Sequence, residues 1–164
     1  MTLSAEGLSV RLPRGWDGRI RFVVDGPSAA LPAVHLGDPV PIGGTTNAVL
    51  HVGNFGLPAQ RGDYGSGAVE KMGARNVFAA LVEFDPEAAG TPLFASAGLP
   101  RIRGANFGPN AMQRVMPRMC GSQSFCTVAG RAFCLYSVLG SYALQRPLAA
   151  LLDPVIQTIT IAPL

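Results

Sequence analysis

Both ends of this 164-residue chain carry periodic apolar patterns, and these patterns constrain its fold more than any other feature. Near the start, apolar residues alternate with polar or charged ones over residues 8–12 and again over residues 19–24. A two-residue period is typical of strands with one buried face. A proline and two glycines separate the two runs, so the sequence predicts a β-hairpin here. Trp16 lies in this turn, where we expect it to close one end of the core, and it is also a candidate contact for a partner.

The last third of the chain predicts a second hairpin and a helix. Residues 122–128 and 132–139 are strand-like and flank Gly130, which suits a tight turn. From Pro147 onward the apolar residues follow helical spacing. Pro154 is expected to kink this helix or to restart it.

Further strands complete the predicted sheet. Residues 48–55 suit a strand, residues 76–84 suit a central strand because they are nearly all apolar, and residues 158–161 suit an edge strand. Residues 110–115 give a weaker strand signal. The chain is therefore expected to be a single α+β domain, residues 1–164, with an antiparallel sheet of about six or seven strands and the C-terminal helix packed on one face.

Residues 25–47 are predicted to form a long loop. They hold four prolines and four glycines and show no apolar period. Loops of this length in compact domains are typically functional or disordered. His35 and Asp38 within the loop are therefore candidate partner-binding residues.

Charged residues are unusually scarce. They make up 14% of the chain, against a hydrophobic fraction of 48%, so the surface is expected to be apolar or covered by a partner. The leading hypothesis is a non-catalytic protein-binding or assembly factor that engages another protein, or its own copy, through an exposed apolar sheet face or the long loop. The rival hypothesis is a small-ligand carrier or enzyme with a pocket under that loop, where His35, His51 and Asp38 would meet.

The basic residues are unevenly distributed. Residues 88–152 contain no acidic residue but six arginines: Arg101, Arg103, Arg114, Arg118, Arg131 and Arg146. The simplest interpretation places them on turns and outward strand positions, where they keep the protein soluble. The alternative is a basic face that binds an anionic partner, with the first four as the candidate residues. Nucleic acid is the less expected partner, because no neighbouring arginine-rich turns with interleaved aromatic residues occur.

Three cysteines, Cys120, Cys126 and Cys134, lie close together in the sequence. A three-residue hairpin loop would place Cys126 opposite Cys134, near disulfide distance, whereas a loop of two or four residues would exclude the bond. Buried free thiols are the favoured interpretation, because the chain shows no export signal.

No catalytic or cofactor-binding motif is evident. The two histidines, His35 and His51, show no metal-ligand spacing, and no nucleophile elbow or phosphate loop occurs. His51 shares a strand face with apolar residues, which favours a structural role. The carboxylates of Glu83 and Asp85, at a strand end, are expected to be solvated. The sequence thus predicts no cofactor, no metal and no catalytic residue.

The strand–Pro–Gly–Trp pattern of residues 8–16 resembles the entry of Mog1/PsbP-like proteins, including actinobacterial LpqN-type lipoproteins. The end of the chain is similar to theirs as well, with a strand over residues 133–141, a helix, and a strand over residues 158–161. Residues 17–132 are not covered by the resemblance. It implies an α/β/α sandwich around an antiparallel sheet and a role in binding or assembling other proteins. The chain differs from the lipoprotein members in having no signal and no lipidation cysteine near its start.

The sequence also bears on location. No apolar run reaches the length of about 18–20 residues that a membrane-spanning helix requires. The first residues lack the basic and apolar regions of a secretory signal. A cytoplasmic location is therefore expected, although a mature chain whose leader had been removed would look the same.

Overall fold

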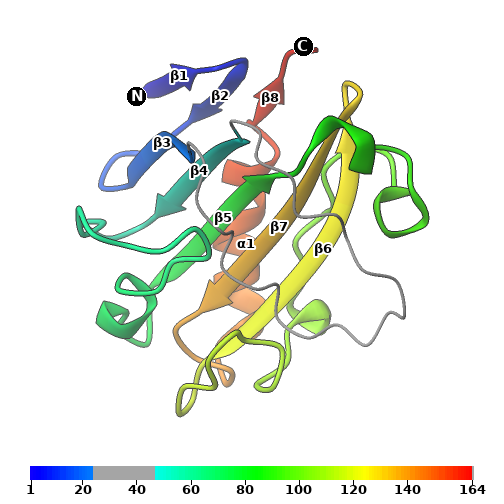
Figure 1. Ribbon diagram of the computed structural model, residues 1–164. Helices are drawn as coiled ribbons and strands as arrows, with labels where there is room; N and C mark the ends of the chain where they lie inside the picture. The colour runs from blue at the N-terminus through cyan, green and yellow to red at the C-terminus, as the bar shows by residue number, and fades with distance from the viewer. Residues whose placement is uncertain (24–46, 164) are drawn as a thin grey trace.

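Two antiparallel sheets and one helix form the part of the chain that the computed structural model describes, residues 1–23 and 47–163 (Figure 1). The strands in these ranges are β1 (Thr2–Ala5), β2 (Leu8–Arg11), β3 (Asp17–Val23), β4 (Asn47–Gly53), β5 (Val77–Glu83), β6 (Cys120–Val128), β7 (Arg131–Leu139) and β8 (Thr160–Ile161). The helices are α1 (Gln145–Ile156) and the short 3-10 turns η1 (Val69–Lys71), η2 (Pro86–Ala88), η3 (Pro92–Phe94) and η4 (Gly104–Asn106).

The large sheet has the strand order β3-β4-β5-β7-β6, and the small sheet has the order β1-β2-β8. Every pair of neighbouring strands is antiparallel. The predicted α+β class and the C-terminal helix packed on a sheet are therefore confirmed. The strands divide between two sheets, however, in place of the single sheet of six or seven strands that the pattern suggested.

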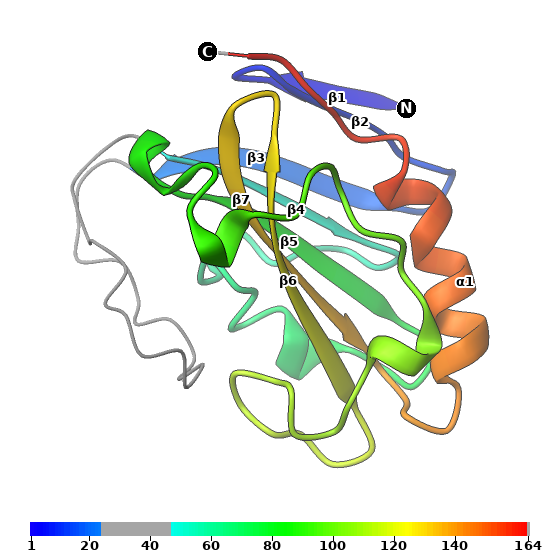
Figure 2. The same ribbon diagram turned by 90° about the vertical axis from the view of Figure 1, so that its right-hand side faces the viewer.

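The central position of β5 explains its almost wholly apolar sequence. All seven of its residues are buried, because it has strand neighbours on both sides and cover on both faces. Leu81 packs with the residues of α1 on one face, where Figure 2 shows the helix lying against the sheet. Phe78 lies on the opposite face, which Tyr64 and Met112 help to cover from outside the sheet.

These two cores account for the high apolar content of the chain. The strands β5 and β7 are buried along their whole length, so the exposed apolar sheet face that the low charge suggested is not found on them. The prediction of such a face is wrong for these central strands, because residues from outside the sheet cover its second apolar face and form a second core with it.

The N-terminal strands pair differently from the predicted hairpin. β2 pairs with β1 on one side and with β8 on the other, whereas β3 pairs with β4. The tight turn lies before β2, at Glu6 and Gly7, whose φ values of 54° and 73° are typical of a type I′ hairpin turn. The predicted pairing of residues 8–12 with residues 19–24 is therefore wrong. The segment between them carries the chain from the small sheet to the large one.

The second hairpin forms where it was predicted, between β6 and β7. Its loop consists of Ala129 and Gly130 alone, because Val128 faces Arg131 across the turn. The φ values of 51° and 76° at the two loop residues again fit a type I′ turn.

This two-residue loop decides the cysteine question. Cys126 lies opposite Phe133, and Cys134 lies opposite Phe125, so the two thiols point to different faces of the sheet. All three cysteines are free and buried. The favoured interpretation of unpaired thiols is confirmed.

The remaining predictions meet mixed outcomes. The helix α1 runs through Pro154 without restarting, and it ends two residues later at Ile156. Residues 110–115 form turns and bends, so the strand predicted there is wrong. The predicted loop of residues 25–47 lies outside the described residues, except for Asn47 at the start of β4. Within the described ranges, no helix has the length and apolar character to cross a membrane.

Candidate functional site

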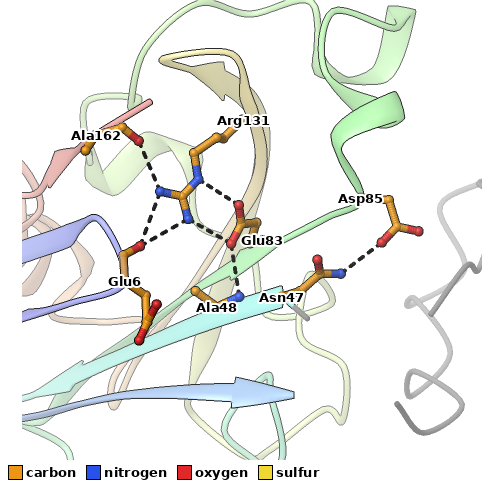
Figure 3. Close-up of polar contacts among 7 residues, drawn as sticks. All are labelled: Glu6, Asn47, Ala48, Glu83, Asp85, Arg131 and Ala162. Carbon is orange, nitrogen blue, oxygen red and sulfur yellow. Dashed lines mark hydrogen bonds and ion pairs between the residues drawn. The ribbon is translucent and has the colours of Figure 1, made fainter. Parts of the chain in front are cut away.

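Arg131 and Glu83 form a buried ion pair at the end of the large sheet where β5 stops and β7 starts (Figure 3). The Arg131 Nε donates to Glu83 Oε1 at 2.7 Å, and its Nη2 donates to Oε2 at 2.9 Å. The same guanidinium donates to the carbonyl oxygen of Ala162 at 3.1 Å and to that of Glu6 at 3.4 Å. Glu83 Oε2 also accepts the N–H of Ala48 at 3.0 Å. The pair therefore joins β4, β5 and β7 of the large sheet to two segments of the small sheet: the β1–β2 turn at Glu6 and the residue that follows β8, Ala162.

This arrangement corrects two predictions. The side chains of Arg131 and Glu83 are only 4% and 8% exposed, so neither is solvated. Arg131 lies next to a tight turn, but its side chain turns inward because a carboxylate on the neighbouring strand compensates its charge. The two residues are 48 positions apart in the sequence, and no local pattern shows that they meet. We name this region the clamp end of the sheet.

His51, on β4, is fully buried and has both ring nitrogens engaged. Its Nε2 bonds to the carbonyl oxygen of Asp63 at 2.7 Å, and its Nδ1 accepts the Nε–H of Arg61 at 2.8 Å. Burial lowers the pKa of His51 to about 4, although the hydrogen bond to Asp63 opposes this shift. The imidazole is therefore neutral at physiological pH, with the proton on Nε2. These contacts agree with the structural role that its sequence context favoured.

The cysteine thiols are also held in unreactive surroundings. Burial raises the pKa of Cys120 and of Cys126 to about 11, and that of Cys134 to about 12. Gln123 donates a hydrogen bond to the Cys134 sulfur at 3.4 Å. Because the thiolate is the nucleophilic form, these cysteines are protonated and inert at neutral pH.

The opposite end of the large sheet collects exposed arginines from four separate segments. The N–H of Gly140 donates to the carbonyl oxygen of Asn76, which follows Arg75 in the chain. The N–H of Tyr142 donates to the carbonyl oxygen of Arg118 at 2.6 Å. The backbone of Arg146 at the start of α1 lies against Gly104, next to Arg103. The connection between β7 and α1 thus draws these segments together, along the lower edge of Figure 1.

We name this region the basic end and define it by five exposed arginines: Arg75, Arg103, Arg114, Arg118 and Arg146. Residues 73–76, 103–119 and 140–146, which meet here, contain no acidic residue. The nearest carboxylate along the chain, that of Glu70, accepts the N–H of Gly67 at 2.6 Å. None of the five arginines forms an ion pair with a described residue.

Exposed apolar side chains accompany these arginines. Val115 is 59% exposed, Tyr142 is 45% exposed and Leu144 is 37% exposed. They account for half of the large apolar residues that are exposed in the described part of the chain. Tyrosine and arginine side chains next to aliphatic ones are typical of protein interfaces.

The backbone of Arg118 is unusual as well. Its φ of 66° lies in the left-handed region, which residues other than glycine rarely adopt. The N–H of Tyr142 donates to its carbonyl oxygen, and its side chain is exposed. Such local strain is common at binding and catalytic sites.

The predicted site residues separate into four groups. Arg103, Arg114 and Arg118 lie at the basic end. Arg101 is exposed but pairs with Asp153 of α1 at 3.2 Å, outside this group. Trp16 is partly buried and packs against the main core, as expected for a residue that closes the end of the core. His35 and Asp38, and the pocket proposed beneath their loop, lie outside the described residues.

Sequence reasoning missed Arg75 because it lies outside the acid-free stretch of residues 88–152. Among residues 1–23 and 47–163, no three His, Cys, Asp or Glu side chains gather as they would at a metal site. No protein-family model, curated protein or solved structure matches the chain.

Proposed function

We propose that this protein is a non-catalytic binding or assembly factor, and that its basic end engages an acidic surface or segment of a partner protein. The observation that carries the proposal is the convergence of five exposed arginines from distant parts of the chain, none of them in an ion pair with a described residue and with no carboxylate in the segments that hold them. Surface arginines placed only for solubility have no reason to gather at one end of a domain that is poor in charge.

The electrostatics of this end favour an anionic partner. Like charges gathered on one surface repel each other, and this repulsion is relieved when a partner supplies carboxylates. A complementary surface also speeds association, with an effect that weakens as salt increases. Self-association through the basic end would instead bring two cationic surfaces together, so a partner other than a second copy is favoured there.

The apolar side chains favour a protein over nucleic acid. Three exposed apolar side chains accompany the arginines: Val115, Tyr142 and Leu144. Their burial against aliphatic or aromatic groups of a partner would stabilise the complex. Arginine forms bidentate hydrogen bonds with carboxylates, which gives geometric specificity toward aspartate and glutamate side chains. A partner segment that alternates acidic and apolar residues would match both features.

The buried polar groups support a non-catalytic role. His51 uses both ring nitrogens in structural hydrogen bonds, and burial keeps the three cysteine thiols protonated. Glu83 is neutralised by Arg131. The proposal also agrees with the resemblance of the chain ends to Mog1/PsbP-like proteins, which bind or assemble other proteins.

The test is a binding titration with three defined probes: a synthetic peptide that alternates glutamate and leucine, a duplex DNA, and vesicles that contain phosphatidylserine. We expect the peptide to bind most tightly and its affinity to fall as the salt concentration rises. The double variant Arg114→Glu/Arg118→Glu should lose most of the affinity for the peptide, because it replaces two cations by two anions.

The matched control is Arg11→Glu/Arg14→Glu, which makes the same charge change at two exposed residues near the small sheet. It should bind the peptide as the wild type does. Equal binding by the two double variants would contradict the proposal, as would tighter binding of DNA or of vesicles than of the peptide.

A further inference from the structure

A second group of arginines lies at the outer edge of the large sheet, away from both ends described above. Arg19 and Arg21 lie two positions apart on the edge strand β3 and therefore point to the same face. Arg19 is the cross-strand neighbour of His51, and the Nε of Arg61 donates to the His51 Nδ1 at 2.8 Å. Three guanidinium groups thus approach one another around a neutral imidazole.

Among the described residues, the acidic side chains nearby do not balance this charge. The carboxylate of Asp17 accepts the backbone N–H groups of Gly18 and Leu57, and its distance from the Arg19 Nε is 3.8 Å. Asp63 pairs with Arg21 alone. The two carboxylates leave an excess of one positive charge among three arginines.

The donors of the three arginines are also incompletely used. The Arg61 Nη1 donates to the carbonyl oxygen of Pro58 at 2.6 Å, which fixes its side chain, but its Nη2 has no hydrogen bond to a described residue. The Arg21 Nε is buried and has no hydrogen-bond partner within residues 1–23 and 47–163. Burial, and after it the charges of Arg21 and Arg19, lower the pKa of Arg61. The side chains of Arg19 and Arg21 remain 62% and 36% exposed, so a ligand from solvent can reach the group.

We infer that Arg19, Arg21 and Arg61 form a binding site for a small oxyanion, the phosphate or carboxylate group of a small molecule. His51 supports the site without titrating, since it holds Arg61 through its Nδ1 lone pair. An oxyanion placed among the three guanidinium groups would receive charge-assisted hydrogen bonds and would remove their mutual repulsion. This inference does not depend on the basic end, because the two groups share no residue.

The experiment uses inorganic phosphate as the probe and sodium acetate as the comparison, at constant ionic strength set with sodium chloride. The thermal unfolding midpoint of the wild type should rise with phosphate concentration and then saturate, because the ligand binds only the folded state. Arg19→Gln removes one exposed cation whose ion-pair contact in the described part of the chain is the 3.8 Å approach to Asp17. Phosphate affinity should then fall roughly tenfold, as expected for the loss of one charge-assisted contact.

Two variants serve as controls. Arg11→Gln removes an exposed arginine from the small sheet and should respond to phosphate as the wild type does. Arg114→Glu/Arg118→Glu should also keep the full response, which separates this inference from the proposed function. In phosphate-free buffer, Arg19→Gln should be at least as stable as the wild type, a result that a purely structural role for Arg19 would not give.

Comparison of the effects of phosphate and acetate indicates the chemical class of the natural ligand. A larger effect of phosphate supports a phosphate-bearing ligand, and an equal or larger effect of acetate supports a carboxylate-bearing one. The inference is overturned if neither anion gives a saturable shift beyond that of chloride. It is also overturned if Arg19→Gln responds like Arg11→Gln, or if the response disappears in the variant of the basic end.

Discussion

At the clamp end of the large sheet, the guanidinium of Arg131 donates to a carboxylate and to two carbonyl oxygens and is almost wholly buried. At the basic end, Arg114 and Arg118 are exposed and have no ion pair with a described residue. All three belong to the same acid-free stretch of the sequence. The side-chain chemistry is therefore identical, and position in the fold decides whether an arginine is buried in an ion pair or exposed to solvent.

The difference follows from what each end can offer to a cation. At the clamp end, the central strand β5 ends in Glu83, next to the hairpin that carries Arg131. A charge can be buried there because its counter-charge and further acceptors are already in place. The basic end is built from loops and the first residues of α1, segments without carboxylates, so its arginines must remain in water or bind an external anion.

The largest effect is expected at the clamp end. Arg131→Met should lower the free energy of unfolding by about 3–5 kcal/mol, because it leaves the buried Glu83 carboxylate without its partner. The double variant Glu83→Leu/Arg131→Met should regain part of this loss, since it buries no unpaired charge. Urea unfolding of the two variants measures both free energies.

Glu83→Gln separates charge from hydrogen bonding at the same position, because the amide keeps an acceptor for the N–H of Ala48. The free energy of unfolding of Glu83→Gln should lie between those of the wild type and of Arg131→Met. A loss below about 1 kcal/mol for Arg131→Met would place this arginine with ordinary surface residues and would remove the contrast between the two ends.

The next effect concerns His51, the other buried basic group of the large sheet. Its pKa is about 4 in the folded state, against 6.5 in the unfolded chain. Between these pH values the unfolded state binds the extra proton, so stability decreases as the pH falls from 6.5 to 4. The full loss is on the order of 3 kcal/mol, and above pH 6.5 this contribution does not vary with pH.

Urea unfolding at a series of pH values should therefore show a steeper acid dependence for the wild type than for His51→Asn. The control is His35→Asn, which changes the other histidine of the chain. Parallel pH profiles for the wild type and for His51→Asn would show that burial of the imidazole is not linked to stability. The comparison between buried and exposed basic groups would then hold for arginine alone.

The sequence predicted those features that depend on local pattern. The period of residues 132–139, the apolar run of residues 76–84 and the helical spacing after Pro147 correspond to β7, β5 and α1. Each signal reflects burial within one continuous segment, which a sequence records directly. The hairpin at Gly130 was also predictable, because few residues other than glycine suit the second position of a type I′ turn.

Features that depend on contacts between distant segments were not predictable in this way. Whether β2 pairs with β3 or with β8 is decided by the turn at Gly7 and by the path of the C-terminal chain. The loop between β6 and β7 has two residues, and this length excludes a bond between Cys126 and Cys134. A hydropathy pattern does not distinguish a two-residue loop from a three-residue one.

The candidate site shows the same division. The absence of acidic residues from residues 88–152 indicated a basic region, but it could not separate Arg131 from the exposed arginines or include Arg75. The contacts that bring Arg61 to His51 lie in an irregular segment with no periodic signal. Recognition of these groups required the fold.

The most direct test of the contrast between the two ends is urea unfolding of Arg114→Glu/Arg118→Glu beside Arg131→Met. We expect the double charge reversal to leave the free energy of unfolding within about 0.5 kcal/mol of the wild type, while the single change at the clamp end costs several times more. A loss of stability in the double variant as large as that in Arg131→Met would contradict the account, because the arginines of the basic end would then be part of the folded framework and not a free binding surface.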